Sequence, residues 1–164
     1  MRPHPHRARG QLVAALAAVL AFGAHALTAH AAGAGDCDRK CLDRTVDRYL
    51  DALVAHDPTR VMIAPDAKFV ENTKPTAIGE GLWKSASAAP TTFKLYVPDP
   101  VAQQVGFIGV MQEGGMPIQL ALRLKLDHGR IVEIEHLIAR NLRPTSLANL
   151  QTPRPGIMAI VPPA

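Results

Sequence analysis

Aromatic residues and cysteine are scarce in this 164-residue chain, in which tryptophan occurs once and tyrosine twice. Cys37 and Cys41 are the only cysteines. Such a pair lacks the two further ligands of a structural zinc site, and the three later histidines show no ligand spacing. Phosphate-binding loops are also missing, because Gly79 and Gly81 make too short a glycine pattern for a dinucleotide. We therefore expect neither a metal nor a nucleotide cofactor.

The N-terminal region is typical of a cleavable signal peptide over residues 1–31. Its first residues carry three arginines and no acidic residue, residues 12–27 form an apolar run, and Ala29 and Ala31 are small residues at a cleavage site. A bilayer span needs roughly 20 continuous apolar residues, so a membrane anchor is the weaker alternative. Cleavage after Ala34 is a second option. The sequence thus predicts a periplasmic or secreted protein, not held in a membrane after cleavage.

Removal of this segment changes the charge of the protein. The whole chain has 18 basic and 14 acidic residues, and three of the basic residues lie in the signal peptide. The mature chain is therefore almost neutral, at +1. It has no basic run with interleaved aromatic residues, so we expect no nucleic acid partner.

Cys37 and Cys41 would lie one helical turn apart. In an oxidising compartment such a pair forms a disulfide or remains as two thiols. A bridge would fasten the start of the first helix.

The mature chain resembles one small α+β domain over residues 32–140. Residues 38–56 repeat apolar side chains at three- and four-residue steps, which predicts an amphipathic helix. A short helical turn through residue 63, a strand over 67–71 and a short helix over 79–87 are expected next. Four strands follow, and they are predicted over residues 92–97, 103–112, 118–126 and 131–139.

The third of these four strands alternates leucine or isoleucine with polar residues, as a half-buried antiparallel strand does. A curved antiparallel sheet wrapped around the first helix would make a cone with an apolar pocket. The proline-rich tail, residues 141–164, is expected to form no regular element.

Several segments resemble the cone-shaped superfamily of nuclear transport factor 2, SnoaL-like cyclases and ketosteroid isomerases. The resemblance covers roughly residues 38–140. Its opening part consists of RYLDAL at residues 48–53, HD at 56–57 and AKFVEN at 67–72. Its closing part is GRIVEI at residues 129–134. The pairing of Glu71-Asn72 with GEGLW at residues 79–83 is similar to an often secreted SnoaL-like subgroup.

The resemblance implies roles for individual residues. Tyr49 falls where ketosteroid isomerases place the tyrosine that donates to the enolate oxygen, and Asn72 falls where they place the proton-shuttling aspartate. An amide cannot act as a general base, and Leu122 lies near the position of the second oxyanion donor, so steroid isomerisation itself is not implied. The resemblance does imply a pocket lined by Tyr49 and Asn72.

Two titratable residues are candidates for proton transfer. His136 shares a strand face with Val132, Ile134 and Ile138, so it is either an acid or base facing an apolar pocket or a histidine bonded within the core. Glu71 becomes the general base only if its side chain, in place of that of Asn72, faces the pocket.

Trp83 is expected to pack structurally or to form a pocket wall for a flat ligand. Arg123 and Gln119 occupy the opposite strand face, which in this superfamily often forms a dimer interface. These features favour an exported, cofactor-independent isomerase, dehydratase or other lyase acting on a small apolar substrate. The alternative is a non-catalytic ligand-binding or homodimeric interaction domain of the same fold.

Overall fold

The computed structural model describes residues 36–153, so the expected signal peptide and the end of the tail, residues 154–164, lie outside the described residues. No helix within the described part is long and apolar enough to span a membrane.

The first helix, α1 (Arg39–Val54), begins after Asp38, whose carboxylate accepts a hydrogen bond from the backbone N–H of Cys41. One face of α1 is fully buried, and it carries Leu42, Val46, Tyr49, Leu50 and Leu53. A short 3₁₀ helix, η1 (Pro58–Arg60), follows. The predicted helix and its apolar face are therefore present.

Seven strands form one strongly curved sheet in the order β2-β1-β7-β6-β5-β3, with β4 also paired to β5. Their bounds are β1 Ile63–Glu71, β2 Lys74–Pro75, β3 Ala86–Ala88, β4 Lys94–Asp99, β5 Gln104–Glu113, β6 Met116–Asp127 and β7 Arg130–Ala139, and the short helix α2 (Leu82–Ser85) lies between β2 and β3. The sequence predicts an antiparallel sheet, and the structure differs at one place, where β1 pairs with β7 in parallel. The chain leaves β1, builds the rest of the sheet and returns beside β1 in the same direction.

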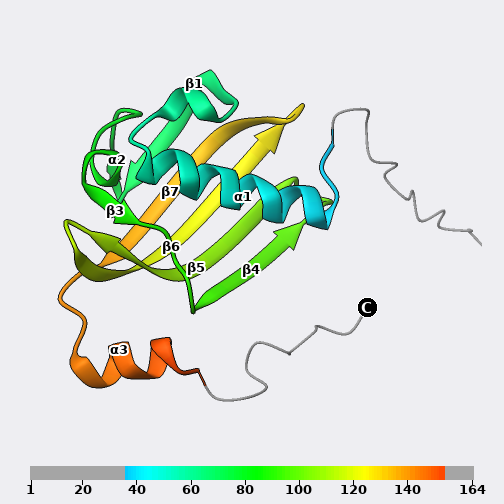
Figure 1. Cartoon of the computed structure of the whole chain (residues 1–164). Helices are drawn as coiled ribbons and strands as arrows, with labels where there is room; N and C mark the ends of the chain where they lie inside the picture. Colours follow the sequence, from blue (N-terminus) through cyan, green and yellow to red (C-terminus); the bar gives the residue numbers. More distant parts are fainter. Residues whose placement is uncertain (1–35, 154–164) are drawn as a thin grey trace, which may run out of the picture.

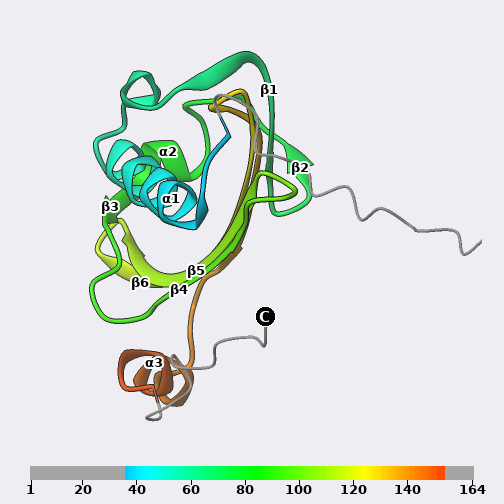
Figure 2. The same cartoon turned by 90° about the vertical axis from the view of Figure 1, so that its right-hand side faces the viewer.

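The sheet curls around α1 to make the expected cone (Figure 1, Figure 2). The concave face of β6 carries the predicted apolar row, in which Ile118, Leu120, Leu122, Leu124 and Leu126 are all buried. The same alternation buries Ile134, His136 and Ile138 in β7. This concave face, covered by α1, is the core of the molecule.

The tail departs from the prediction, because residues Pro144–Gln151 form the helix α3. Proline fits the first turn of a helix, where its missing N–H is not needed, and no further proline interrupts the segment before its end. No residue of α3 is buried. The helix stands away from the body of the sheet (Figure 2).

Candidate proton-transfer site

Tyr49 and His136 meet in the interior of the cone. Tyr49 comes from the buried face of α1 and His136 from the concave face of β7, and the two residues are 0% and 1% exposed. The Tyr49 hydroxyl lies 2.8 Å from Nε2 of His136. The phenol and the imidazole are therefore hydrogen-bonded away from solvent.

Glu71 completes a series of three groups. It stands opposite His136 in the parallel pairing of β1 and β7, and its Oε2 lies 3.4 Å from Nδ1 of the histidine. The same oxygen accepts a hydrogen bond from the backbone N–H of Leu82, at 2.9 Å. Its side chain is 13% exposed, so Glu71 is the member of the series nearest to solvent.

The close approach of α2 to Glu71 depends on Gly81. A Cβ at this position would lie 2.7 Å from both carboxylate oxygens of Glu71, and the backbone φ of +62° is one that other residues rarely adopt. Gly79 and Gly81 do not form a dinucleotide-binding loop. Gly81 has a structural role instead, because it lets the backbone enclose the Glu71 carboxylate.

Burial lowers the pKa of His136 below its ordinary value, although the hydrogen bond and charge of Glu71 act in the opposite direction. Burial alone would raise the pKa of Glu71, but hydrogen bonds from His136 and the Leu82 amide, with the charge of Arg140, bring it below its ordinary value. A neutral imidazole beside a carboxylate places its proton on Nδ1. Nε2 then accepts a hydrogen bond from the Tyr49 hydroxyl.

Burial raises the pKa of Tyr49 well above its ordinary value, and the Glu71 charge adds to the rise. The indole of Trp83 acts in the opposite direction. Its ring packs edge-on against Tyr49 with centroids 5.2 Å apart, and its Nε1 is buried without a hydrogen-bond partner among residues 36–153. A buried N–H donor is therefore available near the phenol oxygen.

Aromatic rings fill this end of the cone. Phe69 packs edge-on against His136 with ring centroids 4.8 Å apart. Trp83 itself is 1% exposed. The interior beside Tyr49 is thus tightly packed, and α2, which carries Trp83, covers it.

Asn72 does not join this group. Its backbone has a positive φ of 46°, and its Oδ1 accepts a hydrogen bond from the Ile138 N–H at 2.8 Å. The side chain therefore extends the pairing of β1 with β7. The expected grouping of Asn72 with Tyr49 is corrected: Glu71 is the side chain from this turn that reaches the histidine.

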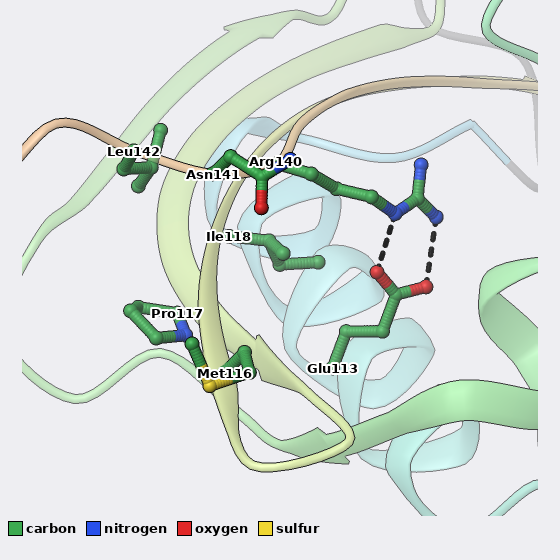
Figure 3. A pocket seen from close by; sticks show the side chains of 7 residues that line it. All are labelled: Glu113, Met116, Pro117, Ile118, Arg140, Asn141 and Leu142. Atoms are coloured by element: carbon green, nitrogen blue, oxygen red, sulfur yellow. Dashed lines mark hydrogen bonds and ion pairs between the residues drawn. The ribbon is translucent and has the colours of Figure 1, made fainter.

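A second pair of side chains, which the sequence analysis did not select, lies at one end of the concave face. Arg140 donates from Nε and Nη2 to the Glu113 carboxylate (Figure 3). Ser85 Oγ donates to the same carboxylate at 2.7 Å. The alternation of β7 offered the signal, because Arg140 follows His136 by four residues and so continues its face.

Cys37 and Cys41 are joined by a disulfide next to the start of α1. The side chain of Gln103 bonds both the N–H and the carbonyl of Cys37. The bridge therefore fastens the entry to α1. Arg123, on the convex face, pairs with Glu133 and Glu135. A homodimer across that face stays a prediction.

No protein-family model matches the sequence, and no curated protein matches it. Solved structures do match. A cystatin-like protein of unknown function from Methylobium petroleophilum is 12% identical, with 66% of this chain and 82% of that chain covered and a TM-score of 0.52. AusH from Aspergillus nidulans is also 12% identical, with 65% and 88% covered and a TM-score of 0.50.

A protein of unknown function from Cytophaga hutchinsonii that is described as nuclear transport factor 2-like is 12% identical, with 60% of this chain and 89% of that chain covered and a TM-score of 0.47. At these identities the likeness concerns the fold alone. The chain therefore has a cystatin-like α+β fold, which agrees with the predicted fold class.

Proposed function

We propose that this chain is an exported, cofactor-independent enzyme that moves a proton on a small, largely apolar substrate, as an isomerase, a dehydratase or another lyase does. The observation that carries the proposal is the buried series Tyr49–His136–Glu71. A hydroxyl, an imidazole and a carboxylate in series can each hold or pass a proton, which is what general acid–base chemistry requires.

The substrate's reacting C–H bond lies next to a carbonyl that makes the proton acidic. That proton goes to the Tyr49 oxygen while the proton of Tyr49 goes to Nε2 of His136. The electron pair of the broken C–H bond stays on the substrate as an enolate, and the Glu71 carboxylate balances the charge of the imidazolium. Return of the proton at another carbon gives an isomer, and its delivery to a leaving hydroxyl gives an alkene and water.

The raised pKa of Tyr49 suits a concerted transfer, whereas burial lowers the pKa of His136 and Glu71 must stabilise the imidazolium. Because burial raises the pKa of Tyr49, a free tyrosinate does not accumulate, and the phenol must gain one proton as it loses the other. The unpaired Nε1–H of Trp83 supplies a donor where negative charge develops near the phenol oxygen. Donors fixed in place before the reaction contribute most to such stabilisation.

Substrate entry requires α2 to move, because Trp83 covers Tyr49. Polar contacts hold this segment at both ends. Glu71 bonds the Leu82 N–H, and His56 Nδ1 lies 2.6 Å from the Trp83 carbonyl, while Ser85 bonds Glu113 and the Gly114 N–H. Opening must break these bonds and expose the buried side chains of Leu82 and Trp83.

The test is proton exchange in heavy water. Small apolar ketones and aldehydes are incubated with the protein, and deuterium at the carbon next to the carbonyl is measured by mass spectrometry. We expect exchange by the wild type, its loss in Tyr49→Phe and His136→Ala, and its retention in Tyr96→Phe. Tyr96 is a matched control because its hydroxyl bonds Asp47 outside the relay. Equal exchange in all four proteins would contradict the proposal.

Export is tested separately. The N-terminus of the protein recovered from a secreting host is expected at Ala32, whereas recovery with Met1 intact would oppose the signal peptide.

A non-catalytic binding or interaction domain is the second candidate. It is favoured by the nearly complete coverage of Tyr49, Trp83 and His136, which is also what a packed core requires. A co-purified ligand that is recovered unchanged, together with no exchange activity, would select this candidate. A chain that binds no ligand and self-associates would select the dimeric interaction domain.

A further inference from the structure

A pocket of about 280 Å³ opens at one end of the cone, and no member of the aromatic cluster lines it. It lies where β5 ends, β6 begins and β7 has just ended (Figure 3). Its lining consists of Glu113, Met116, Pro117, Ile118, Arg140, Asn141 and Leu142. Pockets for small ligands start at roughly 300 Å³, so this one fits a molecule of fragment size.

The pocket shares the concave face with the proton-transfer site. In β6, Ile118 belongs to the buried row that continues through Leu120, and in β7, Arg140 continues the alternation of His136 and Ile138. Ile138 separates the pocket from the histidine along the strand. This pocket, the mouth pocket, is therefore the outer end of the surface whose inner part carries Tyr49 and His136.

The charges inside the mouth pocket cancel. Arg140 donates two hydrogen bonds to Glu113 in a forked arrangement, which is a geometry that favours strong pairing. The hydrogen bonds from Arg140 and Ser85, with the charge of the guanidinium, hold the pKa of Glu113 below its ordinary range, so both members stay ionised. A charged ligand would meet a like charge on one member of the pair.

Hydrogen-bond donors are left over in the mouth pocket. Nη1 of Arg140 and the side-chain amide of Asn141 have no hydrogen-bond partner among residues 36–153, whereas both oxygens of Glu113 already accept hydrogen bonds. The pocket also has apolar lining residues, among which the side chain of Met116 is largely exposed. The free polar capacity thus matches a neutral acceptor on an apolar body.

We propose that the mouth pocket binds neutral apolar molecules that carry a carbonyl group, with the carbonyl oxygen accepting from Arg140 Nη1 and the apolar part lying on Met116, Pro117 and Leu142. Because Glu113 neutralises Arg140, the mouth pocket disfavours charged ligands. This adds a substrate class to the proposed function and rests on it for its biological meaning. The test reads binding alone, so the two proposals can fail separately.

The test uses three probes of similar shape. They are 4-phenylbutan-2-one, which is neutral, 3-phenylpropanoate, which is anionic, and 4-phenylbutan-2-amine, which is cationic. Binding to the full chain is measured by calorimetry, and the site is read from NMR shifts at Met116. For the wild type we expect the ketone to bind more tightly than either charged probe.

The decisive variants alter one member of the pair. Glu113→Gln leaves Arg140 unbalanced, so the carboxylate should gain about tenfold in affinity and overtake the ketone, in line with a charge-assisted hydrogen bond. Arg140→Gln leaves Glu113 unbalanced, so the amine should become the preferred probe. The two variants are expected to change the order of probe affinities in opposite directions. If one variant fails to fold, the affinity order of the other still tests the proposal.

Glu133→Gln is the matched control, because it removes a carboxylate paired with Arg123 on the convex face. It should leave the order of the three probes unchanged. An unchanged order in Glu113→Gln and Arg140→Gln, or binding that does not shift the signals of Met116, would overturn the proposal. Loss of deuterium exchange with the binding order intact would overturn the proposed reaction and leave the mouth pocket standing.

Discussion

Glu71 and His136 stand opposite each other on the parallel strands β1 and β7, and their side chains meet with Oε2 3.4 Å from Nδ1. This pairing orients the imidazole so that its other nitrogen faces the Tyr49 hydroxyl at 2.8 Å. The register of two strands thus aligns three groups from α1, β1 and β7.

Tyr49→Phe removes the hydroxyl and leaves Nε2 of His136 buried without a partner. An unsatisfied buried polar group costs about 1–3 kcal/mol, so the free energy of unfolding should fall by that amount in urea denaturation. Tyr96→Phe removes a hydroxyl of a half-buried ring that bonds Asp47, and it should cost less. Equal losses in the two variants would mean that the Tyr49–His136 bond adds nothing specific.

Gly81→Ala should displace Glu71. The new Cβ would lie 2.7 Å from the carboxylate oxygens at a φ of +62°, so we expect a loss of at least about 2 kcal/mol. Gly114→Ala is the control, since it has a similar φ of +55° but nothing within 4 Å of the new Cβ, and backbone strain alone should cost about 1–2 kcal/mol. Matching losses in thermal or urea unfolding would argue against crowding at Glu71.

Stability should fall at acidic pH because of His136. Its folded-state pKa lies below the ordinary 6.5, so its contribution is complete above about pH 6.5 and is lost as the pH falls through the folded-state pKa. Glu71, whose pKa is also lowered, adds a loss of the same sign that begins below its ordinary 4.5.

His136→Gln should flatten the first part of this pH profile, measured by urea unfolding at a series of pH values. His128→Gln, which removes an exposed histidine outside the relay, is the comparison variant. A wild-type slope in His136→Gln would assign the effect to other groups.

The disulfide should contribute modestly, because it closes a short loop with a sequence separation of 4. The chain-entropy relation gives about 2 kcal/mol for so small a loop. The double variant Cys37→Ser, Cys41→Ser should therefore remain folded with at most that loss in urea unfolding. Complete unfolding of the variant would show that the bridge holds more than the start of α1.

The sequence alone was sufficient for elements whose pattern is local. The apolar stripe of α1 and the strict alternation of β6 each record burial on one face, and the same alternation placed His136 on the concave side. The helix α3 was missed because the prolines around it outweighed the short stretch 144–151, whose proline stands at the one helical position that accepts it.

Features that depend on distant segments were not readable in the sequence. The parallel pairing of β1 with β7 and the turn at Asn72, with its positive φ, decide that Glu71 faces inward. No local periodicity encodes either one. The Arg140–Glu113 pair likewise joins the ends of two strands that flank β6 without pairing with each other, so no pattern within one strand reveals it.

The state of the His136 ring tests the account most directly. In ¹H–¹⁵N NMR spectra at near-neutral pH, we expect the His136 proton on Nδ1 and a Nε2 signal typical of a nitrogen that accepts a hydrogen bond. Tyr49→Phe should shift this Nε2 signal, and Tyr96→Phe should not. A proton on Nε2, or a Nε2 signal that is indifferent to the loss of the Tyr49 hydroxyl, would contradict the relay.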